Sequence, residues 1–63
     1  MEIKKGVFLI WKWKDDKTYK KSYIQDCMDT QKGKLLELTD SSWFSNYPTR
    51  ILVSDIDILD TQP

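Results

Sequence analysis

An all-β fold, built as a small closed barrel of five short strands, is the fold class that this sequence predicts. Three observations support it. The segment GVFLIWKWK alternates in character with period two, branched residues dominate TRILVSDIDIL, and only brief turns separate the strand-like segments. Closure into a barrel suits so short a chain because it removes exposed strand edges. We therefore expect one domain, residues 1–63.

The first expected strand, GVFLIWKWK, carries two different faces. One face holds Val7, Leu9, Trp11 and Trp13, and the other holds Phe8, Ile10, Lys12 and Lys14. The second face becomes polar toward its end, which predicts a strand that is buried at its start and solvated at its end. Leu9 and Trp11 are then expected in the core, whereas Trp13 lies toward the hairpin end, where a ligand can reach it. The residues KDDK turn the chain.

The next segment, TYKKSYIQDCM, fits two structures. As a strand its residues alternate, and we expect a strand over 17–25 followed by one turn of helix. As a helix, Ile24, Cys27 and Met28 fall at i, i+3 and i+4, with Ser22 and Gln25 as a capping box. An α+β fold with one helix around residues 22–32 is therefore the alternative fold class.

The rest of the chain alternates between strand and loop patterns. GKLLELTD, residues 33–40, is strand-like, and SSWFSNYP, residues 41–48, is a loop by its Ser, Asn and Pro content. Two short strands, 50–53 and 56–59, are expected around Ser54–Asp55. The final DTQP is expected to be a frayed or truncated end.

The composition limits the chemistry that is available. The sequence has no histidine and one cysteine, Cys27, for which we expect a buried structural thiol. No familiar pairing of a nucleophile with a base is present, so we expect no enzyme, no cofactor and no metal site. The net charge is zero, but residues 1–22 carry seven lysines against three acids and residues 23–63 carry seven acids against three basic residues. This asymmetry either orients a charged partner or is satisfied within the fold.

The order of these motifs resembles the Tudor domain, a five-stranded SH3-like barrel that often reads methylated lysine. The matching segments are GVFLIWKW, KDDKTY, GKLLELTD and RILVSDIDIL, so the likeness spans nearly the whole chain. In the Tudor domains of Polycomb-like proteins and DNA-damage adaptor proteins, a strand that ends in Trp is followed by a Tyr about six residues later. Trp13 and Tyr19 have that spacing. The sequence departs from the family at Leu38, where a cage aromatic is expected, and at the bulky Trp11.

The resemblance implies an aromatic site that binds a protein or peptide partner. An ammonium ion with several methyl groups is attracted to aromatic faces, and a carboxylate selects lower methylation states. Trp13, Tyr19, Asp40 and either Trp43 or Phe44 are the residues that would supply these parts. Two adjacent large aromatics in a polar loop are difficult to bury together, so we expect Trp43 or Phe44 at the surface. We therefore expect a non-enzymatic module that binds a protein segment.

Two other functions remain open. Lysines interleaved with aromatics around Trp13 are typical of single-stranded nucleic-acid binding, although the balanced net charge weakens that interpretation. A small phage- or plasmid-encoded effector that inhibits a host protein also fits the size and composition. We expect an intracellular protein that does not span a membrane, nuclear for a Tudor domain and in the host cytoplasm for a phage effector.

Overall fold

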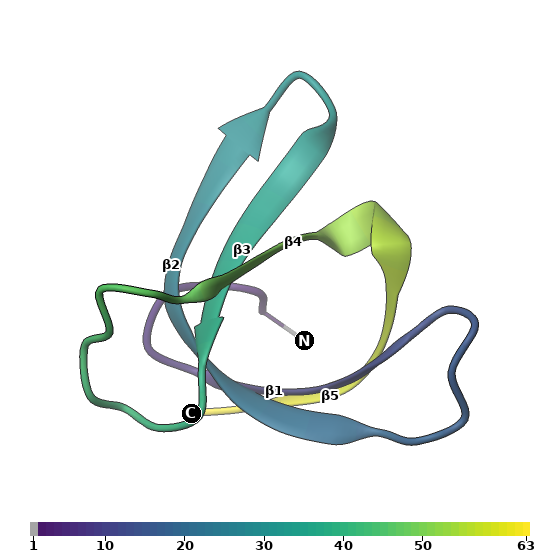
Figure 1. Ribbon diagram of the computed structural model, residues 1–63, viewed down its shortest axis with the longest axis horizontal. Coiled ribbons are helices and arrows are strands. Elements are labelled where there is room, and N and C mark those ends of the chain that lie inside the picture. Colours follow the sequence, from purple (N-terminus) through teal and green to yellow (C-terminus); the bar gives the residue numbers. More distant parts are fainter. Residues whose placement is uncertain (1) are drawn as a thin grey trace.

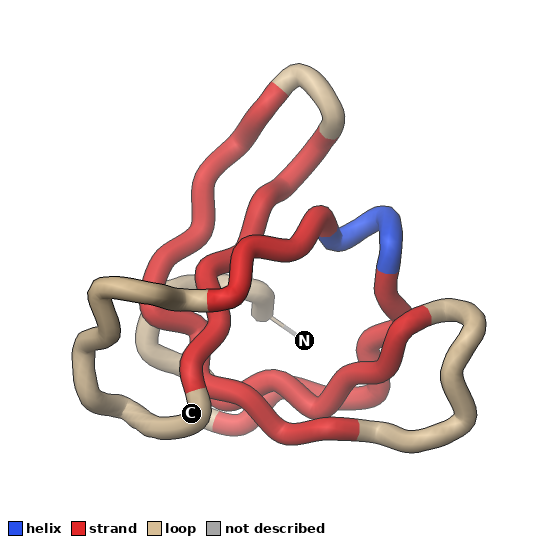
Figure 2. The backbone as a smooth tube through the Cα atoms, viewed as in Figure 1, coloured by secondary structure: helices blue, strands red, loops and turns tan. Residues whose placement is uncertain are grey.

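The computed structural model describes residues 2–63. Its five strands form one antiparallel sheet (Figure 1). The strands are β1 (Phe8–Trp13), β2 (Lys20–Thr30), β3 (Gly33–Thr39), β4 (Thr49–Leu52) and β5 (Ile56–Gln62). They lie in the order β4-β3-β2-β1-β5. The sheet curls round on itself, and the short 3₁₀ helix η1 (Val53–Asp55) joins β4 to β5 (Figure 2). The predicted all-β class with a small, barrel-like sheet of five strands is confirmed.

The core lies on the inner face of the curled sheet. Alternation along β1 places Leu9 and Trp11 inward, with 0% and 4% of their surfaces exposed, as expected from the sequence. Leu36 on β3 and Ile51 on β4 are direct neighbours on the same face. The remaining buried apolar side chains are Val7, Ile24, Leu38 and Ile56. The strand β1 is thus buried at its start and exposed at Trp13, its last residue.

A β-bulge in β2 explains why this strand resembled a helix. Ile24 pairs with Leu38, but the next paired residue is Asp26, opposite Glu37, so Gln25 is an extra residue. The bulge changes the phase of the alternation, and Ile24 and Cys27 both face the core although they lie three positions apart. The helical alternative for residues 22–32 and the turn of helix after residue 25 are therefore wrong. Cys27 is only partly buried, against the edge of the core, rather than fully buried as expected.

A second bulge lies in β5, where Leu59 is an extra residue. Ile10 pairs with Asp60 and Trp11 pairs with Ile58, so Leu59 has no opposite residue on β1. The strand continues past this point to Gln62, which pairs with Phe8. The expectation of a frayed end for DTQP is wrong for Asp60, Thr61 and Gln62, because β1 offers them a complete pairing partner.

The two edges of the sheet are β4 and β5, each hydrogen-bonded to one neighbour only. η1 bridges the gap between them along the chain (Figure 2). The loop between β3 and β4, expected from its composition, spans residues 40–48 and folds back beside β2 and β3 (Figure 1). Across residues 2–63, no helix has the length and apolar character that a membrane crossing would need.

Candidate functional site

Three aromatic side chains in the loop of residues 40–48, called here the aromatic loop, are almost completely exposed. Trp43, Phe44 and Tyr47 expose 81%, 78% and 92% of their surfaces. The expectation that at least one of the Trp43–Phe44 pair lies at the surface is confirmed for both. Tyr47 was missed in the sequence because Ser45 and Asn46 separate it from the aromatic pair, although an aromatic residue before Pro48 in a polar loop is itself a signal.

The backbone of the aromatic loop is nevertheless tied down. The side-chain amide of Gln25 donates to the carbonyl oxygen of Ser45 at 2.9 Å and accepts the N–H of Ser45 at 2.6 Å. The hydroxyl of Thr39 donates to the carbonyl of Ser41 at 2.6 Å, and the N–H of Tyr47 donates to Ser45 Oγ at 3.1 Å. A loop with these fixed points presents its aromatics in a defined arrangement, which lowers the entropy cost of binding.

A hollow of about 230 Å³, called here the Trp13 hollow, lies between the end of β1 and the start of the aromatic loop. Trp13, which is 37% exposed, and Asp40 both line it. Trp11 and Trp13 meet edge to face, with ring centroids 5.3 Å apart. The ammonium of Lys20 lies 5.4 Å from the centroid of Trp11. The chain's own lysine therefore already occupies one aromatic face in this hollow.

A neighbouring hollow of about 300 Å³, called here the loop hollow, is lined by the aromatic loop itself. Trp43, Phe44 and Tyr47 line it together with Asp40. The Trp13 hollow and the loop hollow share Leu38, Thr39, Asp40 and Thr49. Asp40 therefore stands between the two, and the surface from Trp13 to Tyr47 is continuous.

The five predicted site residues are only partly brought together. Asp40 shares one hollow with Trp13 and the other with Trp43 and Phe44. Tyr19, which is 44% exposed in the loop between β1 and β2, lines neither hollow. The arrangement is therefore an elongated aromatic surface with a central carboxylate.

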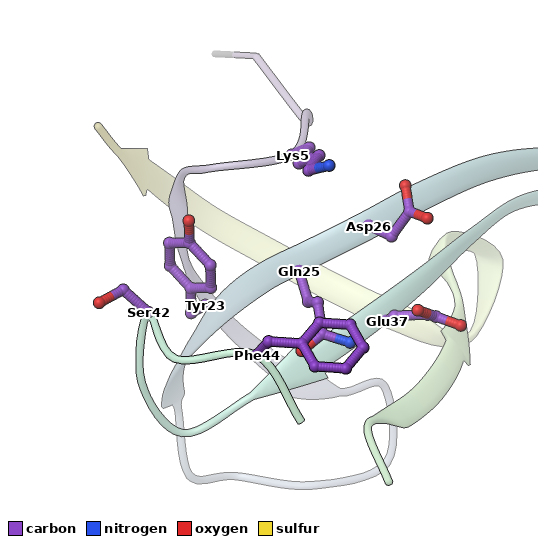
Figure 3. Close-up of a pocket in the computed structure, with 7 residues that line it drawn as sticks. All are labelled: Lys5, Tyr23, Gln25, Asp26, Glu37, Ser42 and Phe44. Atoms are coloured by element: carbon purple, nitrogen blue, oxygen red, sulfur yellow. The ribbon is translucent and has the colours of Figure 1, made fainter. Parts of the chain in front are cut away.

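A third hollow of about 220 Å³, called here the Phe44 hollow, lies on the outer face of β2 and β3 (Figure 3). Phe44 belongs to it as well as to the loop hollow. Tyr23, Asp26 and Glu37 line its floor and sides, and none of these was predicted as a site residue. The bulge is the reason that they meet. It places Gln25 and Asp26 on the same outer face as Tyr23, a phase change that alternation alone does not predict.

Ion pairs across the sheet satisfy part of the charge asymmetry. Lys12 Nζ lies 2.9 Å from Asp57 Oδ2, which joins the basic first third of the chain to the acidic remainder. The hydrogen bond to Asp57 raises the pKa of Lys12, although burial of the ammonium acts in the opposite direction. Between β3 and β4, Arg50 Nε donates to Glu37 Oε2 at 2.9 Å, a pair that lies within the acidic part of the chain.

Within residues 2–63, no three or more Cys, Asp or Glu side chains cluster closely enough to hold a metal ion. The side chains that line the three hollows carry carboxylates, an amide, hydroxyls, and the ammonium groups of Lys5 and Lys20. The features that can act here are aromatic faces, the carboxylates of Asp26, Glu37 and Asp40, and an anchored loop, and these are suited to binding.

Comparisons of the chain with protein-family models, with curated proteins and with solved structures find no match.

Proposed function

We propose that this protein is a non-enzymatic binding module that recognises a protein segment through the aromatic loop and the adjoining Trp13 hollow. The observation that carries the proposal is the exposure of Trp43, Phe44 and Tyr47 on a backbone that Gln25 and local hydroxyl groups tie down. Tryptophan and tyrosine are enriched among the residues that dominate binding energy at protein interfaces. Rigid aromatic side chains also supply contact area at a low entropy cost.

The shape of the surface favours an extended segment as the partner. The hollows follow one another around the aromatic loop, and neighbouring hollows share Asp40 or Phe44. Alternate side chains of an extended peptide point to the same side, so successive hollows can receive successive residues of one segment.

Methylated lysine, the ligand that the Tudor resemblance implies, is the finer form of this proposal. The Trp13 hollow contributes Trp13 and Asp40 to it, as the resemblance requires. Two features weigh against a strong methyl-lysine site. Tyr19 lies outside the hollow, and Lys20 places a positive charge at the face of Trp11. We therefore propose recognition of a protein segment as the function, with methyl-lysine as one candidate residue of that segment.

Single-stranded nucleic acid is a weaker candidate because the lysines around the aromatics do not form one strip. Lys20 lies over Trp11 on the inner face, whereas Lys21 lies 4.9 Å from the centroid of Phe8 on the other face. A nucleic-acid backbone needs a continuous path of positive charge. Titration with oligothymidylate at low and high salt tests this alternative directly, since electrostatic binding weakens steeply with salt.

The proposal is tested by selecting a random peptide library displayed on phage against the immobilised protein. The matched counter-target is a triple variant, Trp43→Ser, Phe44→Ser and Tyr47→Ser, whose replaced side chains are exposed and contribute little to the core. A control variant, Leu59→Ser, removes an exposed apolar side chain from β5 instead. Peptides that bind the wild type and the control but not the triple variant are the expected result. Recovery of the same peptides on the triple variant would contradict the proposal.

A further inference from the structure

We propose that the Phe44 hollow is a subsite for the guanidinium group of an arginine in the bound segment. The inference rests on the proposed function and names the chemistry of the partner. The hollow shares no lining residue with the Trp13 hollow, and Phe44 is the one residue of the sequence-predicted site that lines it.

The size of the Phe44 hollow suits a single side chain. Its volume of about 220 Å³ is below the range of about 300–1,000 Å³ that is typical of pockets for small molecules. In the close-up, the Phe44 ring overlaps the Gln25 side chain, with Tyr23 on one side of the view and Glu37 on the other (Figure 3). One side chain of a bound segment is the occupant that this volume favours.

Aromatic faces and carboxylates line this hollow together. Phe44 and Tyr23 offer ring faces, and Asp26 and Glu37 offer carboxylate oxygens on the side away from Tyr23 (Figure 3). A guanidinium group satisfies both, because its flat face stacks on an aromatic ring while its N–H groups donate to carboxylates. An ammonium group is a compact charge without a flat face, so it can donate to the carboxylates but cannot stack on the aromatic ring.

The carboxylates retain capacity for a further donor. Glu37, whose side chain is only 13% exposed, accepts Arg50 Nε through Oε2. Asp26 accepts the N–H of Cys27 through Oδ1. A carboxylate has about four acceptor positions, so each group can accept additional N–H bonds from a ligand. Arg50 already shows that the guanidinium group pairs with Glu37 in this chain.

Charge in the wider surface is consistent with a basic partner. Residues 23–63, which supply the aromatic loop and every lining residue of the hollow except Lys5, carry seven acids against three basic residues. Lys5 is the one opposing charge among the residues that line the hollow, and it enters from the segment before β1 (Figure 3). Removal of that charge should therefore strengthen arginine binding, a direction that a purely structural role for Lys5 does not predict.

The first test is a titration of the ¹⁵N-labelled protein with N-acetyl-arginine amide. Binding is monitored by NMR through the chemical shifts of the backbone amides. We expect shifts at Tyr23, Gln25, Asp26 and Phe44 with a Kd of about 1–10 mM, as for a single small fragment. The matched probes are the citrulline amide, which has nearly the same shape without the charge, and the lysine amide. The citrulline probe should give no saturable shifts and the lysine probe weaker ones. Equal binding of either probe would overturn the guanidinium assignment.

Variants separate the subsite from general electrostatic attraction. Asp26→Asn keeps an oxygen that can accept the Cys27 N–H but removes the charge, and it should weaken arginine binding roughly two- to fivefold. Asp29→Asn removes an equal charge from the same strand outside the hollow and should change binding little. Lys5→Gln should strengthen binding, and Phe44→Leu should weaken it. Equal effects of Asp26→Asn and Asp29→Asn would overturn the proposal.

The same variants distinguish failure of this inference from failure of the proposed function. Peptides selected on the wild type should be enriched in arginine at one position. Peptides selected on the Asp26→Asn variant should lack this enrichment. Selected peptides without an enriched arginine would overturn the subsite and leave the aromatic loop as the binding surface. Saturable arginine binding that depends on Asp26, with no peptide dependent on the aromatic loop, would support the subsite and contradict the proposed function.

Discussion

Gln25 and Ser45 form a pair of hydrogen bonds that ties the aromatic loop to the bulge of β2. The side-chain amide of Gln25 donates to the carbonyl oxygen of Ser45 at 2.9 Å and accepts the N–H of Ser45 at 2.6 Å, as the backbone of a neighbouring strand would. The bulge makes this contact possible because Gln25 is the residue that has no partner on β3. An irregularity in the sheet therefore fixes the position of the loop that carries the exposed aromatics.

Replacement of Gln25 by alanine should release the aromatic loop. Two hydrogen bonds are lost, and each contributes about 0.5–1.5 kcal/mol net, so the free energy of unfolding should fall by about 1–3 kcal/mol. Hydrogen exchange should become faster at Ser45 and Tyr47, while the core amide of Leu36 changes only with global stability. Gln62→Ala, at an exposed position of β5, is the matched control. Unchanged exchange in the aromatic loop would show that the pair does not hold it.

Ser22 satisfies the only polar atom of the buried Trp11 side chain. Trp11 Nε1 donates to Ser22 Oγ at 3.0 Å. Ser22→Ala should lower the free energy of unfolding by about 1–3 kcal/mol, because the indole N–H is then left without a partner. Ser54→Ala, at an exposed position of η1, should lower the free energy of unfolding much less. Urea denaturation followed by tryptophan fluorescence measures both, and similar losses in the two variants would contradict the assigned role of Ser22.

The ion pair between Lys12 and Asp57 gives a pH dependence with a defined sign. The hydrogen bond to Asp57 raises the pKa of Lys12 above its usual value of 10.5. A raised lysine pKa contributes stability that is present below the unfolded pKa and is lost as pH rises through the folded value. The wild type should therefore lose stability above pH ~10.5 relative to Asp57→Asn, which lacks the pair. The midpoint of urea unfolding, measured for the wild type and Asp57→Asn across this pH range, tests the prediction, and Asp15→Asn is the control. Parallel curves of midpoint against pH for the wild type and Asp57→Asn would contradict the coupling.

Asp60 lies on the edge strand β5, and we expect it to protect that edge from pairing with a second molecule. This strand pairs only with β1, and the N–H of Thr61 donates to Asp60 Oδ1 at 2.8 Å. Removal of the acceptor in Asp60→Ala should free this N–H and favour pairing between the edges of two molecules. Sedimentation velocity should show concentration-dependent association of Asp60→Ala. Asp60→Asn retains an acceptor oxygen, so it should associate less, and equal association of the two variants would point to charge as the protecting feature.

The strands with regular alternation could be predicted from the sequence. Leu9 and Trp11 are buried and Trp13 is exposed, as period two and the lysines at the end of β1 indicate. In β2 the same reasoning correctly predicted a strand over residues 20–25 but not its continuation to Thr30. One extra residue, Gln25, moves Ile24 and Cys27 to a spacing of three on one face. That spacing is also the spacing of a helix, and the local sequence does not distinguish the two. The correct extent of β5 likewise depended on a long-range partner, Phe8.

The candidate site was predictable where it depended on local composition. A loop of Ser, Asn and Pro that contains Trp43 and Phe44 must expose aromatic surface, and the structure confirms it. The grouping of Asp26, Glu37 and Phe44 depends on contacts between β2, β3 and the aromatic loop, which no short segment encodes. The expected grouping of Tyr19 with Trp13 rested on family spacing, and Tyr19 lies outside the Trp13 hollow.

The affinity of a selected peptide for two single variants decides whether the aromatic loop is the binding surface. Isothermal titration compares Trp43→Ala with Leu59→Ala, which removes a comparably exposed apolar side chain from β5. We expect Trp43→Ala to raise Kd roughly tenfold or more, as for an aromatic residue that dominates an interface, and Leu59→Ala to leave it unchanged. Equal affinity of both variants for the peptide would contradict the claim that the aromatic loop is the binding surface.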